Sequence, residues 1–302
     1  MSALPTLTQL RHLVALQEVL NFSRAAERMF VTQSTLSASI KELESVLDLR
    51  LVERNQRNVA FTDDGIEVAS RARRILGETS DLVEYCERAI VPFSGKLRLS
   101  AIPTIAPFVF PKLLPALGNS YPNLKCFLRE DQTLTLLEKL RNAEIDIGIF
   151  ALPFDVPEAL ETMDIAQDPF VFVSATAVAP NARALATTKL EHEQLLLLED
   201  GHCLREHAIS ACAISAQAQG RTLAATSLPT LVQMVESGLG STLLPQLAIS
   251  GGLLAGRALY VRALTPRPPA RTLALVFRKT TSRRNEIGLL HALLVRQFSA
   301  NK

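Results

Sequence analysis

The chain has 302 residues, of which 48% are hydrophobic and 21% charged, and its 32 lysines and arginines against 30 acidic residues leave a formal net charge of +2. That composition is typical of a folded chain with a substantial core, and at about 150 residues per domain it predicts two domains or three small ones. It excludes a disordered chain, a collagen-like repeat and a small scaffold held by disulfides, while the near-zero charge favours neither a nucleic acid nor a membrane surface as partner.

The N-terminal residues lack a basic start, an uninterrupted apolar run and a small-residue cleavage site, so they predict no signal peptide. Residues 237–256 carry no charge and are long enough to span a bilayer, but repeated glycines and a proline argue against a membrane helix. We therefore expect a cytoplasmic protein with no membrane partner, in which thiols are normally reduced.

The first sixty residues are typical of short helices. Apolar side chains recur at helical spacing over residues 10–20, and a second helical segment begins at Ser23, a suitable N-cap. Thr32 is a good N-cap for a third helix over residues 33–46, whose apolar positions again fall at helical spacing. Two helices joined by a break of only about three residues predict a helix-turn-helix.

The predicted exposed positions of that third helix are all polar: Gln33, Ser34, Thr35, Ser37, Ser39 and Lys41. Small donors and acceptors near a helix N-terminus suit base edges and phosphates in a DNA major groove. An ordinary solvated helix face is the alternative, and residues 1–63 hold seven basic and seven acidic side chains, so net charge does not favour DNA.

Two short predicted strands, at residues 51–54 and 59–62, follow the helices and would form a wing. Arg50, Arg54 and Arg57 cluster there, where contacts to DNA phosphates would fall. The candidate DNA-contacting residues are therefore Thr32, Gln33, Ser34, Thr35, Ser37, Lys41, Arg54 and Arg57.

A long helix is predicted after the wing, over residues 63–90. Small or apolar residues recur every seven positions along it and form a weak coiled-coil-like seam, which suggests pairing with a second copy of the chain. The seam consists of Ala69, Leu76, Val83 and Ile90, with Ala72, Thr79 and Cys86 between them. We assign residues 5–62 to a winged domain and residues 63–92 to a linker and dimerisation helix.

From residue 96 onward, predicted strands alternate with predicted helices, which indicates an α/β architecture with a parallel-rich sheet. In such a sheet, ligands bind beyond the carboxyl ends of the strands. The sequence contains no dinucleotide-binding, P-loop or zinc motif, so we expect no cofactor and no bound metal. A closing helix is expected over about 282–299, and the expected strands cover residues 96–102, 125–130, 145–150, 170–174, 195–199, 241–244 and 272–278.

Residues 21–54, NFSRAAERMFVTQSTLSASIKELESVLDLRLVER, resemble the winged helix-turn-helix of LysR-type transcriptional regulators. The resemblance implies an N-terminal winged helix-turn-helix, a long linker helix and a C-terminal α/β effector domain like a periplasmic binding protein. It also implies a homodimer or homotetramer that binds double-stranded DNA at an interrupted palindrome and contacts RNA polymerase. Ser34 stands where the family commonly has proline, and serine is tolerated there because proline contributes mainly a fixed φ at the first helical position.

On this resemblance, the effector domain covers residues 96–302 and has two subdomains. Subdomain I is expected over about 96–166 and 273–302, and subdomain II over about 167–272. The cleft between them is where a ligand-gated member of the family would hold a small organic effector.

Cys203 and Cys212 are the most informative of the four cysteines. Residues 200–201 are predicted to end a strand and begin a helix, which places Cys203 in the first turn of that helix. There the helix dipole favours the thiolate, and Arg205 and a protonated His202 would favour it further. Only the thiolate attacks a peroxide, and a second thiol can capture the resulting sulfenic acid as a disulfide.

The spacing of these two cysteines prevents a disulfide within an intact helix. Cys212 lies nine residues after Cys203, which is about 13.5 Å of helical rise, whereas a disulfide needs Cα atoms within about 7 Å. A bond between them would therefore require the helix to unwind. Two buried, unreactive cysteines are the alternative, and we expect that packing role for Cys86 and Cys126.

The motif LEDGHCLR at residues 198–205, with a second cysteine nine residues after the first, resembles the peroxide-sensing members of the LysR family. This resemblance implies that Cys203 reacts with peroxide, that Cys212 is its resolving partner, and that a thioredoxin- or glutaredoxin-type reductant resets the pair. Glu206 departs from the aspartate of that motif. The implied pocket contains Thr104, Thr133, His202, Arg205 and Arg271, although helix capping alone would also explain the two threonines.

The sequence therefore predicts a cytoplasmic, non-enzymatic DNA-binding regulator that senses hydrogen peroxide and activates antioxidant genes. One alternative is a LysR-type regulator gated by a small organic effector. The other is a thiol peroxidase that uses the same cysteine pair, with the helical domain as a docking module.

Overall fold

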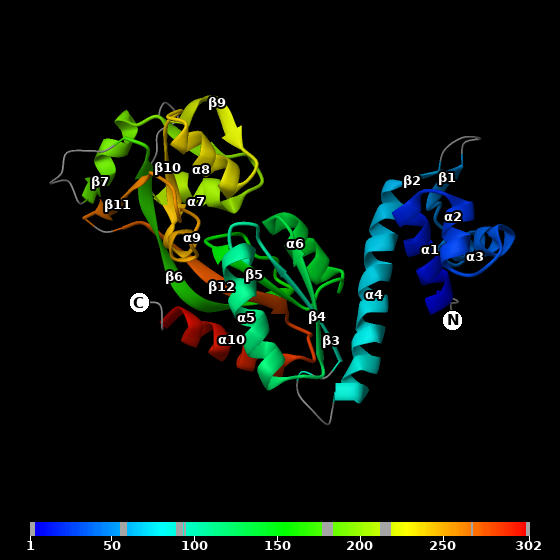
Figure 1. Cartoon of the computed structure of the whole chain (residues 1–302). Coiled ribbons are helices and arrows are strands. Elements are labelled where there is room, and N and C mark those ends of the chain that lie inside the picture. The colour runs from blue at the N-terminus through cyan, green and yellow to red at the C-terminus, as the bar shows by residue number, and fades with distance from the viewer. Residues whose placement is uncertain are drawn as a thin grey trace. The chain divides into compact units, whose positions relative to one another are not determined.

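The protein folds into two compact units (Figure 1). One unit contains Met1–Ala89 and Arg141–Glu144, and the other contains Ile90–Leu140 and Ile145–Lys302. The computed structural model describes residues 4–54, 59–88, 93, 95–176, 184–211, 219–266 and 268–299.

The N-terminal unit has the predicted helices and wing. Its elements are α1 (Leu7–Val19), α2 (Phe22–Arg28), α3 (Gln33–Leu47), β1 (Val52–Arg54), β2 (Val59–Phe61) and α4 (Asp63–Arg88). Thr32 caps α3 as predicted, because its hydroxyl accepts a hydrogen bond from the backbone N–H of Thr35 (3.2 Å). The N-cap of α2 is Asn21 rather than Ser23, since Asn21 has an extended backbone and accepts from the N–H of Arg24 (3.0 Å).

The core of this unit is formed by α1, α2, α3 and the first half of α4. Leu13, Leu36 and Ile40 are fully buried in it, and Ala69 and Ala72 of α4 belong to the same cluster. The first half of the predicted seam is therefore used inside the chain, because α4 packs on α1. The large apolar side chains that α4 leaves exposed are Ile66, Ile75, Leu82 and Val83.

A buried histidine joins α1 to α3. Nδ1 of His12 lies 2.8 Å from Oγ of Ser39, a residue that the sequence pattern places on the exposed face of α3. Ser39 is half-buried and serves helix packing instead. Burial and the positive charge of Arg11 lower the pKa of His12, so the neutral imidazole holds the two helices together.

The C-terminal unit is built around a sheet of ten strands in the described residues. The strands are β3 (Gly95–Ala101), β4 (Leu124–Glu130), β5 (Ile147–Leu152), β6 (Leu160–Ser174), β7 (Ala184–Ala186), β8 (Leu195–Leu198), β9 (Gln219–Ala225), β10 (Ser241–Pro245), β11 (Tyr260–Thr265) and β12 (Ala270–Arg278). The helices are α5 (Ala106–Ser120), α6 (Thr133–Arg141), η1 (Thr187–His192), α7 (Cys203–Ala211), α8 (Leu228–Glu236), α9 (Gln246–Ser250) and α10 (Arg284–Ser299). None of the described helices is both long and apolar enough to cross a lipid bilayer.

Two long strands, β6 and β12, run antiparallel to each other through the middle of the sheet (Figure 1). The strand order is β4-β3-β5-β12-β6-β10-β8-β9, with β11 beside β6 and β7 beside β11. β3 pairs in parallel with β4 and β5, and β8 pairs in parallel with β9 and β10. The predicted α/β class is confirmed, but the sheet is mixed because β6 and β12 separate its two parallel parts.

The sequence pattern found only part of β6 and missed three further strands. It predicts a strand over residues 170–174, whereas β6 begins at Leu160, because the intervening residues are mostly polar and half-exposed. β7 is only three residues long, and β9 and β11 each contain an arginine that interrupts the apolar pattern.

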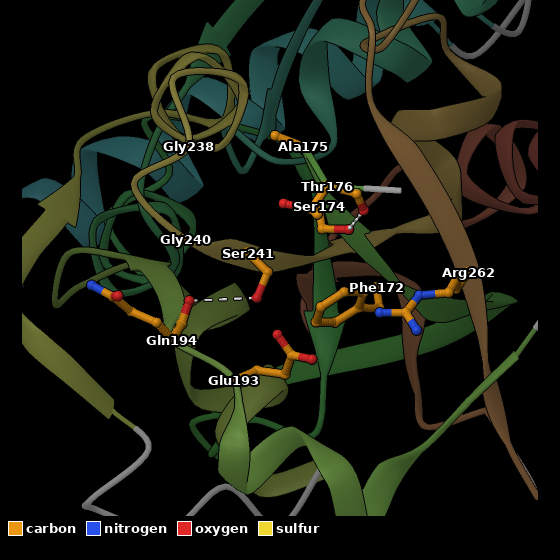
Figure 2. Close-up of a pocket in the computed structure, with 10 residues that line it drawn as sticks. All are labelled: Phe172, Ser174, Ala175, Thr176, Glu193, Gln194, Gly238, Gly240, Ser241 and Arg262. Atoms are coloured by element: carbon orange, nitrogen blue, oxygen red, sulfur yellow. Dashed lines mark hydrogen bonds between the residues drawn. The ribbon is translucent and has the colours of Figure 1, made fainter. Parts of the chain in front are cut away.

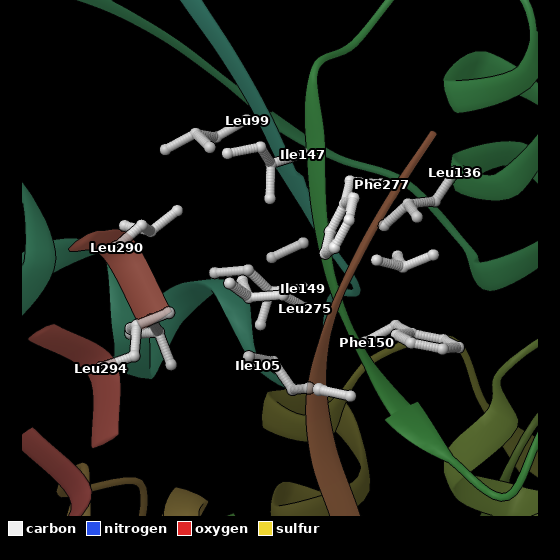
Figure 3. Close-up of a cluster of buried hydrophobic side chains, with 14 of the residues drawn as sticks. Leu99, Ile105, Leu136, Ile147, Ile149, Phe150, Leu275, Phe277, Leu290 and Leu294 are labelled. Carbon is white, nitrogen blue, oxygen red and sulfur yellow. The ribbon is translucent and has the colours of Figure 1, made fainter. Parts of the chain in front are cut away.

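Two hydrophobic clusters fill this unit. The first packs β3, β5 and β12 against α5, α6 and α10 and includes Leu99 and Phe150 (Figure 3). The second packs the end of β6, β8 and β10 against α8. α7 contributes to both, since Cys203 belongs to the first cluster and Leu204 and Ala208 to the second. Cys203 therefore lies where the two clusters meet.

Candidate functional site

The loop between β8 and α7 carries Cys203 to a small hollow. β8 ends at Leu198 and α7 begins at Cys203 itself, whose side chain is only 6% exposed. The hollow lies at the carboxyl ends of β3, β4 and β8, where α/β sheets bind ligands. Its empty space is about 160 Å³ when the part open to solvent is counted, but none of that space admits a water-sized molecule. It is lined by Ile102, Pro103, Thr104, Gln132, Thr133, Gly201, His202 and Cys203.

Three of the predicted pocket residues, Thr104, Thr133 and His202, line this hollow together with Cys203. The hydroxyl of Thr133 is buried at the start of α6, close enough to the Cys203 sulfur to lower the pKa of its thiol. A hydroxyl in this place can donate a hydrogen bond to a thiolate.

Arg271 is fully buried behind the hollow, as the second residue of β12. Its Nε donates to Oδ2 of Asp168 (3.0 Å), and its Nη1 and Nη2 donate to Oγ1 (2.9 Å) and the backbone oxygen (3.3 Å) of Thr104. The register of β12 and β6 places Arg271 directly opposite Asp168, which also accepts from the N–H of Leu247 (2.8 Å). The ion pair thus holds Thr104 in place and puts a buried positive charge beside the hollow.

Burial raises the pKa of the Cys203 thiol above its ordinary value. The positive charge of Arg271, the nearby Thr133 hydroxyl and the backbone N–H groups at the start of α7 lower that pKa, but by less than burial raises it. The sequence predicts that Arg205 favours the thiolate, but Nε of Arg205 lies 3.1 Å from Oδ1 of Asp200, and Arg205 does not line the hollow. The thiol is therefore protonated at rest, and Arg271 is the arginine that acts on it.

Asp131 anchors the turn that leads into α6 and Thr133. It is buried, accepts a hydrogen bond from Ser100 (2.9 Å) and pairs with Lys139 and Arg129. Burial by itself raises the pKa of Asp131, but the hydrogen bonds and positive charges of these neighbours outweigh it and hold the pKa below its usual value. The carboxylate therefore stays ionised and ties the ends of β3 and β4 together beneath the hollow.

Three residues absent from the predicted site complete the surroundings of Cys203. Gln132 lines the hollow, and Asp168 becomes a candidate only once the register of β6 and β12 is known. His207 lies one turn after Cys203 on α7, with Nε2 2.8 Å from the carbonyl oxygen of Pro153. Burial lowers the pKa of His207, so its imidazole is neutral. The sequence signal that could have identified His207 is its spacing of four residues from Cys203, which places both on one face of a helix.

The remaining cysteines are placed only in part. Cys126 is half-buried on β4, and burial raises the pKa of its thiol, which fits the predicted packing role. Cys212 and the side chain of Cys86 lie outside what the structure describes. Within the described chain, no group of three or more His, Cys, Asp and Glu side chains is arranged to hold a metal ion.

Gly201 has a left-handed backbone, with a φ of +94°, and a Cβ there would lie 2.8 Å from Oε1 of Gln132. We expect Gly201→Ala to destabilise the C-terminal unit by about 1–3 kcal/mol, because alanine is strained at this φ. Urea unfolding measures the loss. Gly118→Ala in α5, where a Cβ would meet no atom within 4 Å, is the matched control and should not destabilise. Equal stability of Gly201→Ala and the parent protein would contradict this expectation.

The predicted DNA-contacting residues gather at the start of α3. Five of them are exposed: Thr32, Gln33, Ser34, Thr35 and Lys41. Ser37 is half-buried, and the side chains of Arg54 and Arg57 lie outside the described part of the chain. One end of α3 therefore presents a row of hydrogen-bonding groups to solvent.

Comparison with known proteins accounts for both units. Residues 7–66 match the family described as "Bacterial regulatory helix-turn-helix protein, lysR family", and residues 92–299 match the LysR substrate binding domain. The chain is 42% identical over 296 residues to the HTH-type transcriptional regulator EstR of Acinetobacter baylyi, with 98% of both chains covered. It is 36% identical over 269 residues to the DNA-binding transcriptional dual regulator OxyR of Escherichia coli, which covers 89% of this chain and 88% of that protein.

Solved structures of OxyR have the same fold. A full-length OxyR variant from Pseudomonas aeruginosa aligns with a TM-score of 0.79 at 31% identity, over 97% of this chain and 95% of that one. A peroxide-bound OxyR variant from Corynebacterium glutamicum aligns with a TM-score of 0.66 at 31% identity, over 100% of this chain and 95% of that one. The chain therefore belongs to the LysR family of bacterial DNA-binding transcriptional regulators.

Proposed function

We propose that this LysR-family regulator is a cytoplasmic transcriptional activator that senses hydrogen peroxide through Cys203. The observation that carries the proposal is the buried Cys203 thiol beside a small hollow, between the hydroxyl of Thr133 and the positive charge of Arg271. Relatives named as hydrogen peroxide-inducible genes activators support it. The name of EstR states no ligand. The alternative is therefore a regulator gated by a small organic effector that binds between the two subdomains.

The first step is attack of the Cys203 sulfur on peroxide. Once the thiol has lost its proton, the thiolate bonds to one peroxide oxygen, the O–O bond breaks, and the other oxygen leaves as hydroxide and takes up a proton to become water. Cys203 is oxidised to a sulfenic acid and peroxide is reduced. Arg271 and the donors at the start of α7 favour this step because they stabilise the negative charge on sulfur and oxygen.

The second step joins Cys203 to Cys212 and requires α7 to unwind. The Cys212 thiolate attacks the sulfenic sulfur, forms the S–S bond and displaces hydroxide, which leaves as water. α7 is helical from Cys203 to Ala211, so the Cα atoms of Cys203 and Ala211 are about 12 Å apart. A disulfide needs about 7 Å or less.

Unwinding of α7 would be transmitted through its two hydrophobic contacts. Cys203 would leave the first cluster, and Leu204 and Ala208 would leave the second. The resulting change in a homodimer or homotetramer would alter binding to an interrupted palindrome and contact with RNA polymerase. A thioredoxin- or glutaredoxin-type reductant would restore the thiols by exchange.

Disulfide mapping after oxidation tests the proposal. Reduced protein treated with one equivalent of peroxide is expected to contain a Cys203–Cys212 link in a non-reducing digest and to show a changed DNA footprint. Absence of the link, with both thiols slow to react, would contradict the sensor and favour the regulator gated by an organic effector. Sustained peroxide turnover with thioredoxin, without a footprint change, would favour a thiol peroxidase.

The DNA face of α3 carries a separate prediction. Lys41→Gln is expected to weaken binding to all sequences and to reduce the slope of log K against log salt by about 1, because it removes one phosphate contact. Gln33→Ala should cost about 1–3 kcal/mol on the operator and relax its specificity, because it removes a base contact. Fluorescence anisotropy at several salt concentrations measures both. Lys189→Gln, on η1 in the other unit, removes the same charge and is the matched control. An unchanged salt slope for Lys41→Gln would show that Lys41 contacts no phosphate.

A further inference from the structure

Arg262 occupies an inward-facing position on β11. Exposed and buried side chains alternate along the end of this strand, and Arg262 is buried on the same face as Leu264. Its side chain is only 7% exposed, and it pairs in register with Phe172 of β6, whose ring centroid lies 4.7 Å from the guanidinium carbon. A charged side chain thus fills a position that the alternation assigns to the core.

This buried guanidinium has no hydrogen-bonding or charged partner among the residues that the structure describes. Nε of Arg262 is buried and unbonded, and the interaction that its side chain makes with the described residues is the contact with Phe172. Arg271, in the same unit, is by contrast paired with Asp168. A buried cation is unfavourable unless a counter-charge compensates it, and stacking on an aromatic ring compensates only in part.

Arg262 lines a hollow that is separate from the one at Cys203 (Figure 2). The hollow lies at the amino ends of β8 and β10, whereas Cys203 follows the carboxyl end of β8. Its cavity volume is about 190 Å³. That volume is below the roughly 300–1,000 Å³ of pockets for drug-sized ligands, so it suits a molecule of only a few non-hydrogen atoms.

Glu193, Ser174 and Ser241 supply hydrogen-bond acceptors to this hollow, and the side chains of Thr176 and Gln194 also line it. Glu193 is half-buried, and its carboxylate forms no ion pair with Arg262 or with any other described residue. The hydroxyls of Ser174 and Ser241 donate to backbone carbonyl oxygens (3.2 and 3.4 Å), which leaves their oxygens free to accept. Figure 2 shows the guanidinium of Arg262 and the carboxylate of Glu193 on different sides of the Phe172 ring. The hollow thus offers the guanidinium donors of Arg262 together with acceptors from Glu193, Ser174 and Ser241.

We propose that this hollow binds a small amino acid. Its carboxylate would pair with the guanidinium of Arg262, and its ammonium group would donate to Glu193 and to the hydroxyl oxygens of Ser174 and Ser241. The Phe172 ring would cover a small apolar side chain. Binding at this site would neutralise the buried charge of Arg262, and it does not depend on peroxide chemistry at Cys203.

A different role for Arg262 makes the opposite prediction. β11 pairs with β7 only from Ala263 to Thr265, so the start of β11 has an edge that no other described strand covers. The sole role of an inward-pointing charge near such an edge can be to prevent pairing with another chain. In that case, the hollow binds no amino acid, and loss of Arg262 causes aggregation.

Thermal unfolding and calorimetric titration of the reduced full-length protein separate these roles. L-Alanine is expected to raise the midpoint of the C-terminal unit saturably, above a sodium chloride control of equal ionic strength, and to bind more tightly than acetate. Arg262→Gln should weaken L-alanine binding by at least about tenfold. Glu193→Gln should remove the preference for L-alanine over acetate. Lys189→Gln, which removes an exposed positive charge outside the hollow, should bind like the parent protein.

Two results would overturn the proposal. One is the absence of any saturable response to L-alanine or acetate in the parent protein. The other is equal binding by the parent protein and Glu193→Gln, a variant whose fold does not depend on the buried arginine. Peroxide reactivity of Cys203 is measured separately, so failure of this site leaves the proposed sensor untouched.

Discussion

Cys203→Ser is expected to abolish the reaction with hydrogen peroxide and the accompanying change in DNA footprint. A serine hydroxyl keeps the size of the thiol and its place at the start of α7, but it cannot be oxidised to a sulfenic acid. Stopped-flow mixing with peroxide, followed by mass spectrometry, measures the loss. Cys212→Ser should still form the sulfenic acid at Cys203 but should not reach the disulfide state.

Cys126→Ser is the matched control for this prediction. Cys126 is a half-buried thiol on β4, outside the hollow that contains Cys203, and its replacement should leave the peroxide reaction unchanged. Retention of the footprint change in Cys203→Ser would show that the response uses another group. Loss of the response in Cys126→Ser would show that the assignment of the reactive thiol is incorrect.

The pH dependence of this reaction follows from the burial of Cys203. Because burial raises the pKa of its thiol, the thiolate is a minor species at neutral pH and its fraction grows as the pH rises. We expect the second-order rate constant with peroxide to increase continuously from about pH 6 to about pH 9. A rate that is flat over this range would mean that the thiolate is already formed at pH 6.

Arg271→Met is expected to destabilise the C-terminal unit by about 3–5 kcal/mol, because it leaves the Asp168 carboxylate buried and unpaired. It also removes both hydrogen bonds to Thr104 and the positive charge that lowers the pKa of Cys203. The peroxide reaction at neutral pH should therefore be slower in any folded variant. Guanidinium unfolding and stopped-flow kinetics measure the two effects separately.

A second substitution tests whether the unpaired charge causes that loss. Asp168→Asn in the Arg271→Met background removes the charge but keeps an oxygen that accepts from the N–H of Leu247, so it should recover much of the lost stability. Arg284→Gln breaks the exposed pair with Glu161 and should change stability little. No recovery in the double variant would mean that lost packing, rather than charge, destabilises Arg271→Met.

Local sequence signals were sufficient for the N-terminal unit. The apolar spacing in α1 and α3 and the Thr32 cap lie within single helices, so the sequence displays them directly. One difference there is the N-cap of α2, which is Asn21 rather than Ser23. Others arose from contacts between helices: Ser39 turns toward His12 of α1, and Ala69 is used in packing rather than left free for a second chain.

The candidate site could be anticipated only in part. Thr104, Thr133 and Cys203 each follow a predicted strand, and the carboxyl ends of neighbouring parallel strands meet, so their proximity follows from the α/β pattern. Arg205 and Arg271 could not be ranked in this way. Arg205 is adjacent in sequence but pairs with Asp200, whereas Arg271 reaches the site through the antiparallel pairing of β12 with β6.

The sequence by itself determined the family and the candidate thiol, because motifs, helix caps and apolar periodicity are local properties of the chain. Only the tertiary structure decided the burial that raises the pKa of Cys203, the arginine that acts on it and the burial of Arg262 without a charged partner among the described residues. Each of these depends on burial and on partners far apart in sequence. Desolvation and charge pairing act through space, so residues distant along the chain determine them.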